Sequence, residues 1–117
     1  MSMTSLEAAV IARIGQMPIG DPVAMCAHAR RLHAEADAIA ERARSVSATV
    51  SSARYECPAA TRLRHGSADI EARLTRAAQR LASLADHILA SAHRVEESQQ
   101  VWRRDFARVA REIELRL

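Results

Sequence analysis

The sequence predicts an all-α protein built on an antiparallel two-helix hairpin. Ala, Arg, Leu, Glu and Ser dominate its 117 residues, which include only three Gly, three Pro and one each of Trp, Tyr and Phe. This bias is typical of long helices rather than of sheets. Apolar residues also recur with helical spacing in two long segments, and a break that contains Pro58 separates them.

The first segment predicts a short amphipathic helix. Thr4, with Glu7 three residues later, is typical of a capping box in which Thr4 is the N-cap. The apolar positions that follow are Leu6, Val10, Ile11 and Ile14. Gly15 ends this helix, so we expect residues 1–19 to form a short helix and a linker. A loose terminal tail is the alternative.

The second segment carries the most regular pattern in the chain. Asp21 is a predicted N-cap, and Pro22 occupies the first helical position. Apolar residues then alternate at spacings of four and three: Met25, Ala29, Leu32, Ala36, Ile39, Ala43, Val46 and Val50. Through the middle of this stripe one side is always Ala, at Ala29, Ala36 and Ala43, which lets a partner helix approach closely. We predict a helix over residues 22–53, about 48 Å long at about 1.5 Å per residue.

The third segment predicts a longer helix over residues 59–117, about 85 Å in length at the same rise. Its heptad stripe is Leu63, Ile70, Leu74, Ala77, Leu81, Leu84, Ile88 and Val95. Beyond Val95 the stripe is predicted to shift by one position, to Trp102, Phe106, Val109 and Ile113. The predicted seam of the hairpin is Met25, Leu32, Ile39, Val46, Leu63, Ile70, Leu74, Leu81, Leu84 and Ile88.

The end of the long helix must extend past its neighbour, since it is much longer. Trp102, Phe106 and Val109 lie in this overhang. We expect the short N-terminal helix to cover them through Leu6, Val10 and Ile14. The alternative is that these residues contact a partner protein, because aromatic residues are enriched at binding hot spots.

Residues 54–59 predict a tight turn between the two long helices. Pro58 cannot continue the first helix and suits the first turn of the second. Tyr55 is expected to cover the apolar end of the hairpin. The predicted turn motif is Tyr55, Glu56, Cys57 and Pro58.

Two short motifs carry a resemblance to a known family. Gly20-Asp21-Pro22 opens the hairpin, and Tyr55-Glu56-Cys57-Pro58-Ala59-Ala60 forms its turn. Over residues 20–100 the chain resembles the Trp-x-Gly helical-hairpin family of the ESX, or type VII, secretion system of actinobacteria and their relatives. It is similar to the variants that open with Gly-Asp-Pro and continue with Gly-Pro-Ala-Ala after the turn. Tyr55 stands where the family has Trp, and Cys57 stands where it has Gly. Residues 101–117 then form a C-terminal helical extension.

The resemblance implies a non-catalytic interaction module. Such a chain pairs with the hairpin of a secretion substrate, toxin or effector into a four-helix bundle, as a co-secreted partner or a targeting chaperone. Whether the pair is a homodimer or a heterodimer stays open. The family's export signal Tyr-x-x-x-Asp/Glu is missing, since the single Tyr55 is followed four positions later by Ala59. Either a partner carries this signal, or the chain acts inside the cell.

The charge pattern argues against nucleic acid as the partner. The net charge is only +3, and Arg alternates with Glu and Asp along both long segments. The alternative is a helical regulator that binds nucleic acid through Arg62, Arg64, Arg73, Arg76 and Arg80. No apolar run approaches the roughly 20 residues of a membrane span. We therefore expect synthesis in the cytoplasm without a cleavable signal. Export through type VII secretion is an implication of the resemblance alone, and whether it occurs stays open.

The sequence gives no motif for catalysis, metal binding or a cofactor. The five His have no metal-ligand spacing, and neither His-x-x-x-His nor Cys-x-x-Cys occurs. Cys26 and Cys57 are predicted to lie about 46 Å apart along one helix, too far for a disulfide. We expect no catalytic residue, metal or cofactor. A small all-α enzyme is the other alternative.

Overall fold

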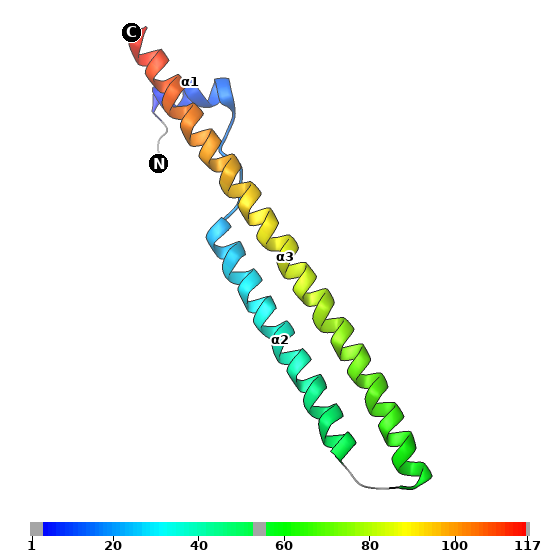
Figure 1. Cartoon of the computed structure of the whole chain (residues 1–117). Helices are drawn as coiled ribbons and strands as arrows, with labels where there is room; N and C mark the ends of the chain where they lie inside the picture. The colour runs from blue at the N-terminus through cyan, green and yellow to red at the C-terminus, as the bar shows by residue number, and fades with distance from the viewer. Residues whose placement is uncertain (1–3, 53–55, 117) are drawn as a thin grey trace. The chain divides into compact units, whose positions relative to one another are not determined.

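The computed structural model describes residues 4–52 and 56–116, which form three α-helices and no β-strand (Figure 1). Helix α1 spans Ser5–Ile14, α2 spans Pro22–Ser52 and α3 spans Pro58–Leu115. The prediction of an all-α chain is confirmed for these residues. No helix among them is both long enough and apolar enough to cross a membrane.

The ends of α1 and the start of α2 follow the predicted local signals. The Thr4 hydroxyl accepts a hydrogen bond from the Glu7 N–H at 3.1 Å, as an N-cap should. Gly15 ends α1 with a φ of +82°, and its N–H donates to the Ile11 carbonyl. The Asp21 carboxylate accepts from the Ala24 N–H at 3.1 Å, so it caps α2.

Helix α3 is continuous over 58 residues and starts at Pro58, one residue before the predicted start. The carbonyl of Cys57 accepts the N–H of Thr61 at 3.1 Å, and its Sγ lies 3.4 Å from the N–H of Ala60. Cys57, the residue directly before Pro58, therefore caps the N-terminus of α3. Tyr55, the predicted cover of the turn, lies outside the described residues.

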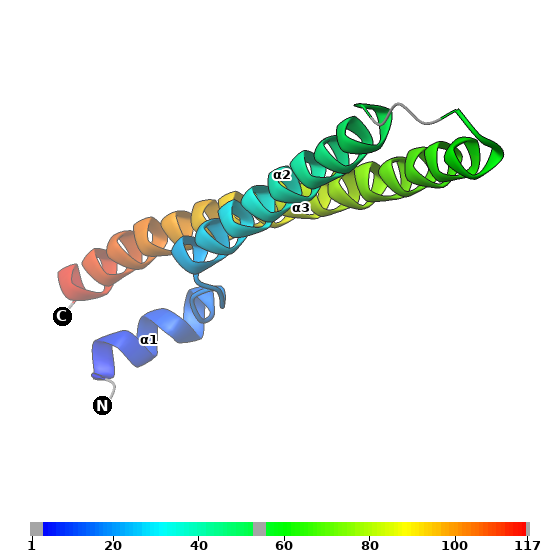
Figure 2. The same ribbon diagram turned by 90° about the horizontal axis from the view of Figure 1, so that it is seen from below.

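The chain divides into two compact units, Met25–Leu89 and the combination of Met1–Ala24 with Ala90–Leu117. In the first of these, called the central unit, α2 lies beside α3 in both views, and the two run in opposite directions (Figures 1 and 2). The second is called the terminal unit, and it holds α1 and the end of α3.

Small side chains form the contact between the helices of the central unit. Its buried apolar residues all recur at intervals of seven: Ala29, Ala36 and Ala43 on α2, and Ala78 and Ala85 on α3. One polar contact also joins the two helices, from His33 Nε2 to Asp86 Oδ1 at 2.9 Å. Alanine at the contact lets the two backbones approach closely.

The buried row of α3 lies one position later than the predicted stripe. Ala78, Ala85 and Ala92 are buried, whereas Leu84 of the predicted stripe is 49% exposed. The row continues at the same interval to the buried Gln99. Beyond Val95, Val109 of the predicted shifted stripe is buried, and Trp102, Phe106 and Ile113 are half-buried. The predicted stripe of the central unit followed the large side chains, whereas the contact follows the small ones.

Overpacking one contact alanine tests this arrangement. We expect Ala43→Leu to lower the free energy of unfolding by about 1–3 kcal/mol, since Ala43 is fully buried and a Leu needs room there. The exposed Ala34 on the same helix gives the control Ala34→Leu, which should change stability little. Urea unfolding followed by circular dichroism measures both, and equal effects would contradict the assignment of the contact row.

Candidate functional site

In the central unit, each helix touches the other through its row of buried alanines, here called the contact row, and has one flank on either side of that row. Successive residues of a helix are about 100° apart, so Leu32 and His33 lie on opposite flanks of the row that contains Ala36. In the same way, Leu84 and Asp86 lie on opposite flanks of Ala85. The contact between His33 and Asp86 shows which two flanks share a side. Leu32 and Leu84 therefore share the other side.

All the residues of the predicted seam fall on the side of Leu32 and Leu84. Met25, Ile39 and Val46 are spaced by multiples of seven from Leu32, and Leu63 and Ile70 by multiples of seven from Leu84. On the surface of α3, Leu74, Leu81 and Ile88 lie between the row of Leu84 and the row of Ala85. We call this set the apolar face: Met25, Leu32, Ile39, Val46, Leu63, Ile70, Leu74, Leu81, Leu84 and Ile88. The structure thus brings the predicted residues together, but beside the contact between the helices and not within it.

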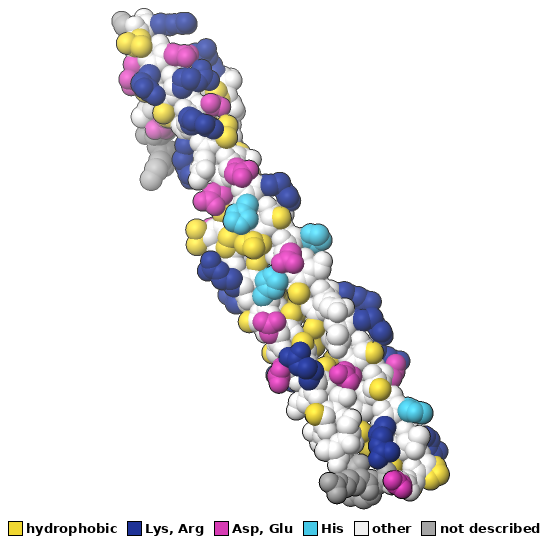
Figure 3. Space-filling view, viewed as in Figure 1, with side chains coloured by type: hydrophobic (Ala, Val, Ile, Leu, Met, Phe, Trp, Pro, Cys, Tyr) yellow, Lys and Arg dark blue, Asp and Glu magenta, His cyan; other side chains and the backbone are white. Residues whose placement is uncertain are grey.

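No member of the apolar face is buried. Val46, Leu63, Ile70 and Leu84 are 44, 59, 51 and 49% exposed, and the others are half-buried. The opposite side carries polar groups at equivalent positions, among them His33 and Asp86. Figure 3 shows one face of the chain, on which charged and histidine side chains are distributed along both units. The large apolar residues of the predicted seam therefore lie on one side of the central unit, while the other side carries His33 and Asp86 together with residues such as Ala40, Ala82 and Leu89.

The predicted cap residues lie in the terminal unit with α1. Val10 of α1 and Val109 of α3 are both buried. The Trp102 Nε1–H donates to the Gly15 carbonyl at 2.9 Å, and its ring lies 5.1 Å from that of Phe106 at a tilt of 38°. Trp102 and Phe106 are half-buried. Contacts within the chain thus occupy part of the surface around Trp102, Phe106 and Val109. In the alternative interpretation from the sequence, that surface contacts a partner protein.

Gln99 is a structural residue of the terminal unit that the sequence interpretation missed. Its buried side-chain amide donates to two backbone carbonyls, that of Pro18 at 3.0 Å and that of Gly20 at 2.9 Å. Gly20 has a φ of +150°, and a Cβ there would meet Val95 Cγ1 at 2.8 Å. The signal in the sequence was a polar residue at the seven-residue interval of Ala78, Ala85 and Ala92.

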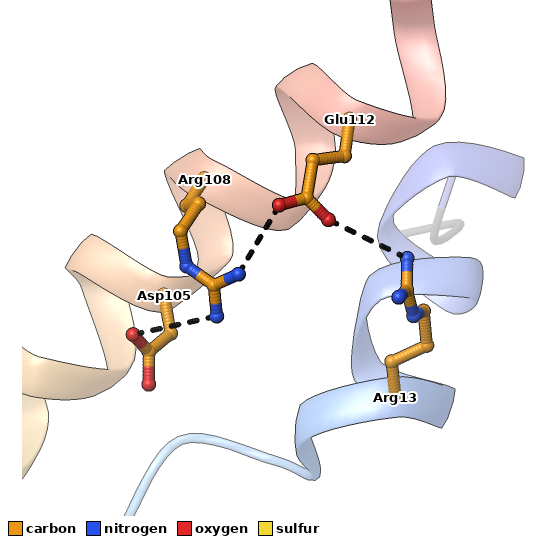
Figure 4. A network of polar contacts seen from close by, with 4 residues as sticks. All are labelled: Arg13, Asp105, Arg108 and Glu112. Atoms are coloured by element: carbon orange, nitrogen blue, oxygen red, sulfur yellow. Dashed lines mark hydrogen bonds and ion pairs between the residues drawn. The ribbon is translucent and has the colours of Figure 1, made fainter. Parts of the chain in front are cut away.

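An exposed ion-pair network also joins α1 to α3 within the terminal unit (Figure 4). Glu112 accepts from Arg108 at 3.2 Å and lies 3.9 Å from Arg13 of α1, while Arg108 lies 3.9 Å from Asp105. All four side chains are at least 40% exposed. Exposed pairs of this kind contribute about 0–1 kcal/mol each, so the apolar and Gln99 contacts stabilise the unit more.

The two cysteines, the described part of the turn motif and Arg44 are the other polar side chains of note. Cys26 and Cys57 are free thiols, and Glu56, Cys57 and Pro58 of the predicted turn motif are exposed. The hydrogen bond with Glu41, and then its charge, raise the pKa of the exposed Arg44, which stays a cation. Within residues 4–52 and 56–116, no group of three or more His, Cys, Asp or Glu could hold a metal ion.

Comparisons with known proteins give no relative for this chain. No protein-family model matches it, and neither a curated protein nor a solved structure does so. The functional interpretation therefore depends on the geometry above and on the resemblance of the two short motifs.

Substitution of Gln99 tests the terminal unit. Gln99→Leu leaves the Pro18 and Gly20 carbonyls without their donor, which we expect to cost about 1–3 kcal/mol. Trp102 is the single Trp of the chain and bonds Gly15 in the same segment, so its emission should shift to the red at lower urea than in the parent. The neighbouring exposed Gln100 gives the control Gln100→Leu. Unchanged emission curves for both variants would show that Gln99 does not hold the segment.

Proposed function

We propose that this chain is a non-catalytic interaction module whose α2 and α3 form an antiparallel hairpin. Through its apolar face the hairpin pairs with a second helical hairpin and completes a four-helix bundle. The partner belongs to a type VII secretion substrate, toxin or effector, and the chain acts as its co-secreted partner or targeting chaperone. The chain presents this pair to the type VII secretion machinery.

The exposure of the apolar face is the observation that supports this proposal. Two helices bury only the strip between them, and here that strip is made largely of Ala, which contributes little apolar area. Large side chains such as Ile70 and Leu84 stay accessible to water. Contiguous apolar surface of this kind is typical of protein interaction sites. A second two-helix layer against it gives the up-and-down bundle architecture.

The motifs of the hairpin support the choice of partner class. Asp21 and Pro22 form the opening that the secretion family shares, and α3 restarts at Pro58 directly after the turn. A chaperone or co-secreted partner needs a surface for another hairpin and no reactive site. The free thiols and the scattered histidines are compatible with that role.

The regulator that binds nucleic acid is the competing class. Its predicted patch includes Arg73, which forms an ion pair with Asp69 at 3.1 Å. An acidic residue within the patch weakens it as a phosphate-binding surface. The apolar face has no role in such a regulator, and it does have one in a bundle.

Charge placed in the apolar face tests the proposal. The tagged chain would be co-expressed with its genomic neighbours, and we expect a stoichiometric helical protein to co-purify with it. Leu84→Asp should weaken this pair by about a hundredfold or more, because assembly would bury an unpaired carboxylate. The exposed Ala72, on the side of α3 that carries Asp86, gives the control Ala72→Asp.

Sedimentation velocity measures the assembly of each variant, and circular dichroism verifies that each one stays helical. Loss of the pair in Leu84→Asp with retention in Ala72→Asp supports the module. Equal binding by both variants, or co-purification of nucleic acid alone, would refute it.

A further inference from the structure

We propose that the apolar face selects a helical hairpin with acidic flanks in preference to a second copy of this chain. This inference rests on the proposed function and adds the chemistry of the partner. It is derived from the charged residues that border the apolar face.

Four arginines border the apolar face, and we call them the basic rim: Arg31, Arg42, Arg73 and Arg80. Arg31 and Arg80 lie two residues after the contact residues Ala29 and Ala78, and Arg73 lies seven residues before Arg80. Arg42 directly precedes the contact residue Ala43. All four are exposed. By helical geometry they lie on the side of the apolar face, away from the flank of His33 and Asp86.

Acidic residues do not balance the basic rim. At the same positions relative to the contact alanines, the single acid of the central unit is Glu35, which precedes Ala36 as Arg42 precedes Ala43. Asp69 lies outside these positions, next to Arg73 on the surface of α3. Asp37 and Asp86 each follow a contact alanine, so they belong to the opposite flank. Within the described residues, Arg42 and Arg80 have no ion-pair partner, while Arg73 pairs with Asp69.

Pairing of two identical copies would place basic rim against basic rim. In a four-helix bundle, the residues that border the core meet their equivalents on the neighbouring helices. Like charges at such positions disfavour a pair, and opposite charges favour it and accelerate encounter. An acidic border on the partner removes the repulsion and gives a carboxylate to Arg42 and Arg80, which have no ion-pair partner within the described residues. The basic rim thus discriminates between partners that have equally apolar faces.

A charge-reversed copy of the chain provides a defined probe. The rim variant carries Arg31→Glu, Arg42→Glu, Arg73→Glu and Arg80→Glu, so it keeps the apolar face and acquires acidic flanks. The control variant carries Arg30→Glu, Arg44→Glu, Arg62→Glu and Arg76→Glu, which change the net charge equally at exposed positions off the rim. Circular dichroism and thermal unfolding verify that both variants fold as the parent does.

Fluorescence energy transfer between labelled copies then measures the dissociation constant of each pair. We expect the parent with the rim variant to bind about tenfold or more tightly than the parent with itself at low salt, from several exposed opposite-charge pairs. The advantage should disappear above about 0.5 M salt, where exposed charges are screened. The parent with the control variant should show a clearly smaller gain.

The outcomes separate this inference from the proposed function. If the parent pairs with itself as tightly as with the rim variant, or if the control variant gains as much, the basic rim does not select the partner. The module itself would then stand, provided that Leu84→Asp still abolishes pairing. If no combination associates, this inference fails, and co-purification of the parent with its genomic neighbours still decides the proposed function separately.

Discussion

Alanine at the contact between α2 and α3 is the constraint on which the rest of the central unit depends. Ala29, Ala36 and Ala43 recur at intervals of seven on α2, and Ala78 and Ala85 do the same on α3. A side chain with only a Cβ allows the helices to approach closely, and the narrow strip between them has no room for Leu or Ile. The larger apolar residues are therefore displaced to the edge of the contact.

This displacement connects local packing to the proposed function. A hairpin with Leu at its contact would bury its own apolar surface and would have little left for a partner. Here Val46, Leu63, Ile70 and Leu84 stay exposed, and helical geometry collects them on one side, away from His33 and Asp86. Their burial requires another layer of helices, so stability and association are linked through the same side chains.

The helix boundaries were predictable, whereas the phase of the α3 contact was not. Caps are local, so Thr4, Gly15 and Asp21 identify helix ends without reference to tertiary structure. The phase depends on which of two adjacent stripes a partner helix covers. A search for apolar periodicity favours the larger residues, such as Leu84, because they are the more hydrophobic. The contact between the helices instead buries Ala85, because its side chain is small. The members of the candidate site could therefore be predicted, but not their position at the edge of the contact.

Gln99 shows the same competition at a polar position. Ala78, Ala85 and Ala92 are buried at intervals of seven, so helix packing alone would favour a small apolar residue at position 99. The segment between α1 and α2 is not helical, however, and it brings the carbonyls of Pro18 and Gly20 to this position without partners of their own. A carbonyl shielded from water without a donor is costly, and the one amide group of Gln99 donates to both of these partly buried groups. Pairing of backbone groups thus selects a polar residue in an otherwise apolar row, and periodicity alone cannot predict that choice.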